Sequence, residues 1–390
     1  MTGAAVLALS PVLGLAGLAG MAMVGAAPTM FAVTGLAVFA SMFFLGLLLC
    51  VPRPGAAWGR WLRAALILGV EVAVVWQVTG ATMRPPPGLA APSPVPGQRE
   101  WRLPTGSRLA YVRIAPKRVT REDPVVFLHG GPGVADLAAD SAFFGKLAAD
   151  GYQVYVYDQL GAGRSARLAD PHEYGLTRDV ADLEAIRQAV GARRLNLVAH
   201  DYGAQLAAAY LAGHPDQVAR AILYSPTGLD RPRSAAATLP GPAGPPAPRV
   251  LAVYTLLRVE PRAAHAFAGD RELEAYLDLA RRRAPRPCQA TATTGSGGSG
   301  GYAGLSERFL PGSVRQGLAG SSAPVLIVKG ACDEQSWSSA AAYRQALPAA
   351  RFAYLENGSA YLGVLRAFLD GRPPDAYIGD RPPPGYLGPM

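Results

Sequence analysis

The chain has 390 residues, of which 50% are hydrophobic and only 17% are charged. Typical soluble domains carry about 25% charged residues, and disordered chains have far fewer apolar ones, so the composition excludes a disordered or fibrous protein. The net charge is +9, but the longest run of adjacent basic residues is only Arg281 to Arg283. A nucleic-acid footprint needs a clustered basic patch, so we predict no nucleic-acid partner.

The few charges near the N-terminus mark a membrane segment. Residues 1–83 hold only four charges, and three apolar stretches cover 4–26, 30–51 and 61–80. A helix needs about 20 apolar residues to cross a bilayer, so 1–83 is expected to form about three transmembrane helices. The first stretch contains Pro11 and several glycines, which leaves two spans as an alternative.

Charge placement predicts how these helices are oriented. Arg53, Arg60 and Arg63 lie between the second and third stretches. Basic loops tend to stay in the cytoplasm, so we expect a multi-pass protein of the cell membrane with an extracytoplasmic soluble domain. Glu71 lies in mid-span, where a carboxylate is either functional, partner-facing or snorkelling.

The three cysteines have no metal-ligand spacing, and we predict neither a metal nor a cofactor. Cys288 and Cys332 could pair in an oxidising compartment, which leaves their redox state open.

The remaining residues alternate strand and helix patterns after a stiff, Pro-rich spacer at 84–98. This rhythm predicts an α/β fold, a mostly parallel sheet with helices on both faces, in two parts at 99–226 and 321–371. The first part contains two short predicted strands within 101–115, around a turn at 105–106, and further strands at 125–128, 154–157, 195–199 and 221–224. The second part has predicted strands at 325–328 and 351–355. Residues 227–320 interrupt the rhythm with a Pro/Gly-rich stretch at 239–247, a helical part and a low-complexity tract at 294–301. Residues 372–390 read as a loose Pro-rich tail.

Three motifs follow predicted strands of this sheet. They are His129-Gly130-Gly131-Pro132-Gly133, the segment Asp158 to Ser165, and Ala199-His200-Asp201-Tyr202-Gly203. Backbone N–H groups of a glycine loop can point at a developing oxyanion, because no side chains intervene. The third motif occupies a strand-to-helix turn, where a nucleophile elbow belongs.

Together these motifs resemble the α/β-hydrolase fold, and specifically the proline iminopeptidases and their aminopeptidase relatives, over about residues 100–230 and 320–370. The resemblance implies that 227–320 is a helical cap over a small-molecule or peptide substrate. It also implies that the backbone N–H groups of Gly131 and Tyr202 form the oxyanion hole. The other loop residues would shape the site, His129 in a structural role; they are His129, Gly130, Pro132, Gly133 and Gly203.

The triad of a serine hydrolase is altered. The elbow carries Asp201 instead of serine, while Asp333 matches the orienting acid. The triad histidine should follow the last strand, but no histidine occurs after His265. The predicted catalytic residues are therefore Asp201 and Asp333.

The elbow also resembles the His-Asp-Trp-Gly elbow of epoxide hydrolases and haloalkane dehalogenases. There the carboxylate attacks carbon, and a histidine-activated water cleaves the resulting ester. That second step needs the missing histidine. Attack of Asp201 on an amide would instead give a labile anhydride.

Five other side chains could act as the base in place of the missing histidine, and the four histidines among them have simpler explanations. His200 should turn away from the site, His214 ends a helix, His172 lies in a loop, and His265 lies in the cap. Glu356 is nearest to the position of the missing base, and it would need a raised pKa to work at neutral pH.

Three functions therefore stay open: a membrane-anchored hydrolase with an altered constellation, a covalent half-enzyme that alkylates Asp201 without release, and a non-catalytic ligand- or protein-binding module. A fourth possibility is that a sequence error or frameshift near residue 357 accounts for the missing histidine.

Overall fold

A computed structural model describes residues 2–86, 93–131, 133–229, 247–283, 300–305, 312–372 and 374–390. Pro132, Cys288 and most of the stretches 239–247 and 294–301 lie outside these described residues. The described chain divides into two compact units. The first contains the N-terminal helices together with 239–280, and the second contains the sheet.

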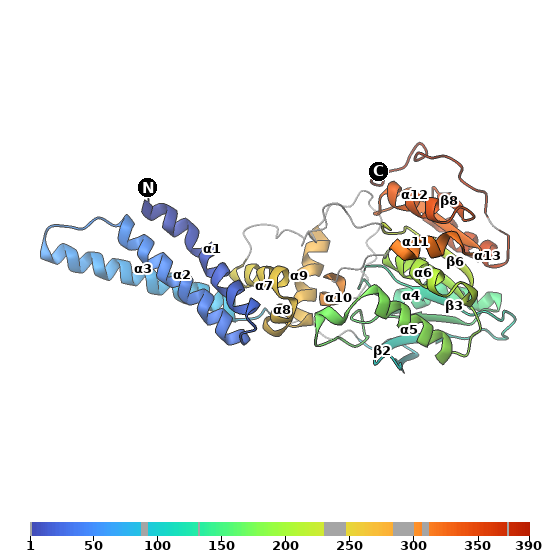
Figure 1. Ribbon diagram of the computed structural model, residues 1–390, viewed down its shortest axis with the longest axis horizontal. Coiled ribbons are helices and arrows are strands. Elements are labelled where there is room, and N and C mark those ends of the chain that lie inside the picture. Colours follow the sequence, from blue (N-terminus) through green and yellow to red (C-terminus); the bar gives the residue numbers. More distant parts are fainter. Residues whose placement is uncertain are drawn as a thin grey trace. The chain divides into compact units, whose positions relative to one another are not determined.

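Three long apolar helices begin the first unit (Figure 1). They are α1 (Thr2–Met23), α2 (Pro28–Cys50) and α3 (Ala57–Met83), and each is long and apolar enough to cross a membrane. The model therefore supplies three candidate spans, the larger of the two predicted numbers.

Glycines let α1 and α2 approach closely. A Cβ at Gly14 would lie 2.9 Å from the Cβ of Phe39, and one at Gly35 would lie 2.8 Å from the Cβ of Leu18. Small residues at helix crossings maximise van der Waals contact where lipid supplies no hydrophobic driving force. The first two helices therefore form a tight antiparallel pair.

Three further helices belong to the same unit: α7 (Pro248–Val259), α8 (Pro261–Phe267) and α9 (Asp270–Arg283). Arg249 is buried and pairs with Glu272 of α9, with Nε to Oε1 at 2.5 Å. Its Nη1 donates a 2.8 Å hydrogen bond to the carbonyl of Thr82, in the last turn of α3. The ring of Phe267 lies 5.8 Å from that of Phe31 on α2. This part of the predicted cap thus packs against the apolar helices.

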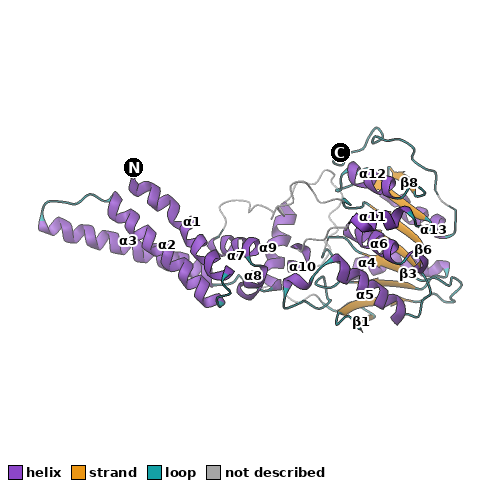
Figure 2. Cartoon of the chain, in the orientation of Figure 1, coloured by secondary structure: helices purple, strands orange, loops and turns teal. Residues whose placement is uncertain are grey.

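The second unit is built on an eight-stranded sheet (Figure 2). Its spatial order is β1-β2-β4-β3-β5-β6-β7-β8. The first strands pair antiparallel, and the others run parallel. The strands are β1 (Gln98–Arg102), β2 (Arg108–Ile114), β3 (Val125–Leu128), β4 (Val154–Tyr157), β5 (Leu195–His200), β6 (Val218–Tyr224), β7 (Val325–Gly330) and β8 (Arg351–Leu355). The mostly parallel sheet predicted from the alternation is confirmed.

Helices cover both faces of this sheet, so its central strands are buried throughout. The helices of this unit are α4 (Leu137–Phe144), α5 (Leu176–Ala189), α6 (Tyr202–Gly213), α10 (Gly301–Leu305), α11 (Gly312–Ala319), α12 (Trp337–Ala346) and α13 (Tyr361–Leu369). Alternate residues of one strand point to opposite faces. Phe127 packs in the cluster formed with α4 and α13, while its neighbours Val126 and Leu128 are equally buried. This explains the uninterrupted apolar runs read from the sequence.

The expectation of a loose tail is wrong for 374–390. Trp337 packs between the rings of Tyr377 and Tyr386, with centroids 5.7 and 5.3 Å away. The backbone N–H of Leu387 donates a 2.9 Å hydrogen bond to the carbonyl of Ala331. The aromatic contacts and this backbone hydrogen bond hold the segment in place, although it has no regular secondary structure.

Candidate active site

Asp201 occupies a strained turn between β5 and α6. Its backbone angles are φ 53° and ψ −115°, a region that residues other than glycine rarely adopt. A Cβ at Gly203 would lie 2.1 Å from the carbonyl oxygen of Leu128, so only glycine fits there. The sharp turn places the carboxylate at the carboxyl end of the sheet. This is the geometry predicted for a nucleophile elbow.

The two predicted oxyanion donors meet at this carboxylate. The backbone N–H of Gly131 donates a 2.7 Å hydrogen bond to Oδ2 of Asp201, and the backbone N–H of Tyr202 also binds the carboxyl group. The Tyr202 side chain is engaged elsewhere, because its hydroxyl donates to Asp179 of α5 at 2.5 Å. The structure thus brings the N–H groups of Gly131 and Tyr202 together at the carboxylate of Asp201 itself.

Gln335 is a site residue that the sequence reasoning missed. It lies in the turn between β7 and α12, and its Nε2 donates a 2.6 Å hydrogen bond to Oδ1 of Asp201. The backbone N–H of Gln335 donates to Oδ1 of Asp333 at 2.8 Å. The available signal was its position two residues after the predicted acid, at the same end of the sheet.

Asp333 is buried, and Gln335 connects it to Asp201 by hydrogen bonds. Its Oδ1 also accepts a hydrogen bond from the hydroxyl of Ser225, and its Oδ2 lies 2.9 Å from Nζ of Lys329. Both side chains of this ion pair are fully buried. Burial lowers the pKa of the Lys329 ammonium, while the Asp333 carboxylate opposes that effect. The predicted acid therefore orients Gln335 and balances a lysine.

Desolvation dominates the electrostatics of Asp201. It raises the pKa of the Asp201 carboxyl, against the lowering effects of His200 and the two backbone N–H groups, and the charge of Asp333 raises it further. Tyr343 is fully buried nearby on α12, and burial with the charge of Asp201 raises its pKa as well. Tyr343 is a second neighbour of Asp201 that the sequence reasoning missed, because an apolar aromatic position on a helix is usually a residue of the hydrophobic core.

His129 makes hydrogen bonds within its own loop and to the second motif. Its Nε2 accepts a 2.8 Å hydrogen bond from the backbone N–H of Gln159, and its Nδ1 lies 2.9 Å from the carbonyl of Gly130. The side-chain amide of Gln159 donates to the carbonyl of His129 at 2.8 Å. These bonds join the first two motifs. Gly130 lies so close to the site that a Cβ there would be 2.8 Å from Oδ2 of Asp201.

Asp158 supports the second motif from a buried position. Its Oδ2 accepts a 2.7 Å hydrogen bond from the backbone N–H of Arg164. Burial raises its pKa to about 6, partly offset by that hydrogen bond. Burial also raises the pKa of Asp140, on α4, to about 7, with added repulsion from Asp136 and Asp158.

The alternative bases make contacts away from Asp201. The ring of His200 stacks on Tyr224, with centroids 5.3 Å apart. His214 ends α6, and His172 is exposed in a short turn. His265 belongs to the first unit, where its Nε2 lies 2.9 Å from Oδ2 of Asp270. Glu356 follows β8 and is exposed. Within the described ranges, no group of three or more His, Cys, Asp or Glu side chains could hold a metal ion.

Comparison with known proteins agrees with this arrangement. Residues 123–247 match the sequence profile of the alpha/beta hydrolase fold family. A proline iminopeptidase from Heyndrickxia coagulans is 40% identical over 103 residues, which are 26% of this chain and 35% of that protein. Another, from Lactobacillus helveticus, is 34% identical over 130 residues, which are 32% of this chain and 43% of that protein. The chain therefore spans less than half the length of these relatives.

A crystal structure of a proline iminopeptidase from Mycobacterium smegmatis aligns with 70% of this chain and 98% of its own, at 20% identity and a TM-score of 0.47. The family profile, the relatives and the sheet with its elbow identify the class. The sheet unit has the α/β-hydrolase fold, and residues 123–247 match the profile of that family. The matching part of the chain is similar to the proline iminopeptidases.

Proposed function

We propose that this protein is a membrane-anchored hydrolase in which the Asp201 carboxylate attacks an electrophilic carbon and forms an ester. The observation that supports it is the pair of backbone donors on the Asp201 carboxylate: Gly131 donates to Oδ2 at 2.7 Å, and Tyr202 donates to the same carboxyl group. Gly131 holds Oδ2 in the position of an oxyanion, and Oδ1 is the attacking atom.

The bond changes of the first step are simple. A lone pair on Oδ1 forms a C–O bond to the substrate carbon, and the leaving group departs with the bonding electrons. A halide needs no proton, whereas an epoxide oxygen takes one from water. Oδ2 becomes the carbonyl oxygen of the ester and stays bound to the backbone N–H of Gly131. Attack of water on that ester would place negative charge on Oδ2, where this preorganised donor stabilises it.

Release of the ester is the slow step in this proposal. The attacking water must lose a proton, and the hydrogen bonds to the Asp201 carboxylate within the described chain come from Gly131, Tyr202 and Gln335, which are all donors. Glu356 is exposed, and it would have to move to act as the base. We therefore expect a long-lived alkyl-enzyme, as in the half-enzyme hypothesis.

Peptide hydrolysis, the activity in the names of the relatives, suits this site less well. The N–H groups that would hold a substrate carbonyl oxygen already bind the carboxylate of Asp201. A carboxylate that attacks an amide would also form a labile anhydride. Haloalkanes and epoxides, whose attack by a carboxylate gives an ester, remain the proposed substrates.

Membrane attachment rests on the three candidate spans. An extracytoplasmic sheet unit follows from the arginines Arg53, Arg60 and Arg63 in the loop between α2 and α3, if that loop is cytoplasmic.

The second candidate function is ligand binding without catalysis. The hydrogen bond from Gln335 to Oδ1 favours it, because a donor on the attacking oxygen weakens a nucleophile. Oδ2 accepts a hydrogen bond as well, so both oxygens of the Asp201 carboxylate are bound by donors of the protein.

Intact-mass spectrometry separates the two functions. The full-length protein in detergent is exposed in turn to an epoxide, a haloalkane and an activated ester, beside an Asp201→Asn variant of nearly the same shape. A mass increase in the wild type that Asp201→Asn lacks supports the nucleophile. Neither adduct nor product from any of the three would overturn the catalytic proposal and leave the binding function.

A further inference from the structure

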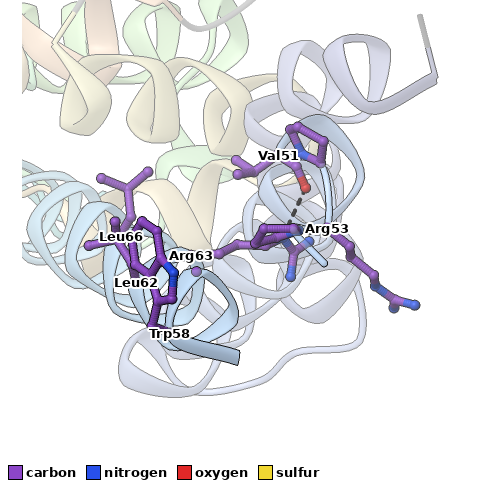
Figure 3. A pocket seen from close by; sticks show the side chains of 9 residues that line it. Val51, Arg53, Trp58, Leu62, Arg63 and Leu66 are labelled. Carbon is purple, nitrogen blue, oxygen red and sulfur yellow. Dashed lines mark hydrogen bonds between the residues drawn. The ribbon is translucent and has the colours of Figure 1, made fainter. Parts of the chain in front are cut away.

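A hollow of about 350 Å³ lies where α2 ends and α3 begins (Figure 3). Its floor comes from the connecting loop and its wall from the first turns of α3. The lining residues are Val51, Pro52, Arg53, Pro54, Trp58, Gly59, Leu62, Arg63 and Leu66.

Positive charge gathers at the loop end of this hollow. Arg53, Arg60 and Arg63 lie within eleven residues, and no acidic residue precedes Glu71 in the sequence. Arg63 is fixed, because its Nε donates to the carbonyl of Val51 at 2.9 Å and its Nη2 to that of Leu48 at 2.7 Å. These bonds anchor the loop to the last turn of α2.

Arg53, unlike Arg63, is not held by hydrogen bonds to the described part of the protein. Its side chain is exposed and has no hydrogen-bond or ion-pair partner among the described residues, and Figure 3 shows it extending away from the fixed Arg63. A fixed loop therefore presents a guanidinium at the mouth of the hollow.

An apolar face continues from the hollow along α3. Trp58, Leu62 and Leu66 are spaced by four residues and form a row, with 73%, 61% and 57% of their surfaces exposed. Figure 3 shows these three side chains stacked along the helix. A second hollow of about 620 Å³ follows on α3, lined by Ala65, Leu68, Gly69, Val72, Ala73 and Trp76.

Helical spacing puts both hollows on one side of α3. A position advances by about 100° per residue, so Trp58, Leu62, Gly69 and Trp76 fall within about 40° of one another. A Cβ at Gly69 would meet no atom within 4 Å, so the groove is open there. The two hollows form one shallow apolar groove.

The length of this groove matches a bilayer. Trp58 and Trp76 are 18 residues apart, or about 27 Å along a helix, and the hydrocarbon core of a bilayer is about 30 Å thick. Tryptophan is enriched at both membrane interfaces. Arg53 therefore lies at the headgroup level beyond Trp58, and the groove runs from there into the core.

We propose that this groove binds an anionic phospholipid. The phosphate pairs with the Arg53 guanidinium, and one acyl chain lies along Trp58, Leu62 and Leu66. Half of the core is about 15 Å, or ten helical residues, so the chain ends beside Leu68 and Gly69. The uncompensated positive charge selects a negative headgroup, and the open glycine accommodates the end of the chain.

Native mass spectrometry of the full-length protein from nanodiscs of phosphatidylcholine and phosphatidylglycerol tests this site. The wild type should retain phosphatidylglycerol in preference to phosphatidylcholine. Arg53→Gln should reduce that preference about fivefold, the factor expected when one arginine beside a bound anionic headgroup is lost. Gly69→Leu fills the groove and should reduce the retention of both lipids.

Two matched variants control for charge and bulk. Arg84→Gln removes an exposed arginine at the other end of α3, and Gly80→Leu fills an equally open position outside both hollows. Both should bind lipid like the wild type. Melting temperatures in detergent check that every variant is folded. Equal retention of the two lipids by the wild type, or unchanged retention by folded Gly69→Leu, would overturn the proposal.

Discussion

The side-chain amide of Gln335 donates a 2.6 Å hydrogen bond to Oδ1 of Asp201, the oxygen opposite the one held by Gly131. The same glutamine binds Asp333 through its backbone N–H. Asp333 therefore acts on Asp201 through an amide, where a serine hydrolase has a histidine. An amide can orient a carboxylate, but it cannot accept a proton from water.

Gln335→Met should shift the pH dependence of Asp201. Methionine has a similar length and no donor, so the carboxylate loses a hydrogen bond worth about 1.5 to 3 kcal/mol for a charged group. We expect the pH of half-maximal alkylation to rise by about one unit or more. The rate of adduct formation measured from pH 4 to 9 checks this. Gln188→Met, on the surface of α5, should leave the profile unchanged.

Alkylation by the wild type should also decline in mild acid. Burial raises the pKa of Asp201 above its ordinary value of 3.8. Only the anion is a nucleophile, so the reaction should be fastest above the raised pKa and disappear as the pH falls through it. A rate that stays constant down to pH 4 would show that the carboxyl group titrates normally.

Asp140→Asn should stabilise the protein at neutral pH and above. The pKa of Asp140 is raised to about 7 in the folded state, so the folded state binds a proton more tightly than the unfolded state does. Stability is therefore lost as the pH rises from about 4 towards 7. The asparagine variant should gain about 1 to 3 kcal/mol at pH 8 and little at pH 4. Melting curves at both pH values measure this, with exposed Asp216→Asn as the control.

Lys329→Met should be strongly destabilising. It leaves the buried carboxylate of Asp333 without its cation, a change that typically costs about 3 to 5 kcal/mol. The double variant Lys329→Met with Asp333→Leu removes both charges and should recover most of that loss. Denaturant titration of the full chain measures both. Arg102→Met breaks the exposed pair with Glu100 and should have an effect below about 1 kcal/mol.

Arg249→Met should loosen helices α7 to α9 from the apolar helices. The variant loses the bonds to Glu272 and to the carbonyl of Thr82, and it leaves Glu272 buried without a cation. Limited proteolysis in detergent should cut this part of the chain much faster than in the wild type. Arg258→Met, on an exposed position of α7, is the matched control. Equal cleavage of the two variants would show that the buried pair does not hold the helices.

The sequence predicted the sheet well, because its buried strands are short apolar runs that end at glycine loops. Val125–Leu128 and Val154–Tyr157 coincide with β3 and β4. The tail was misjudged, because its prolines suggested an unfolded segment while Tyr377 and Tyr386 supply the contacts that fix it on Trp337.

The site was predictable where a motif records a backbone geometry. Gly131, Asp201 and Tyr202 come together as the elbow and glycine loop require. Gln335 and Lys329 escaped prediction, because their roles arise from the packing of β7 beside the site and no local pattern marks them. The packing of α7 to α9 against the apolar helices also depends on the ion pair of Arg249 with Glu272, which no sequence spacing predicts.

The central claim is that Asp201 is a nucleophile towards carbon. Its most direct test is peptide-level mass spectrometry of the full-length protein after incubation at pH 8 with an epoxide or a haloalkane that gave an adduct. The account predicts that fragmentation places the added mass on Asp201 and that the same peptide of Asp201→Asn stays unmodified. An adduct that maps to another residue, or that forms equally on Asp201→Asn, would contradict it.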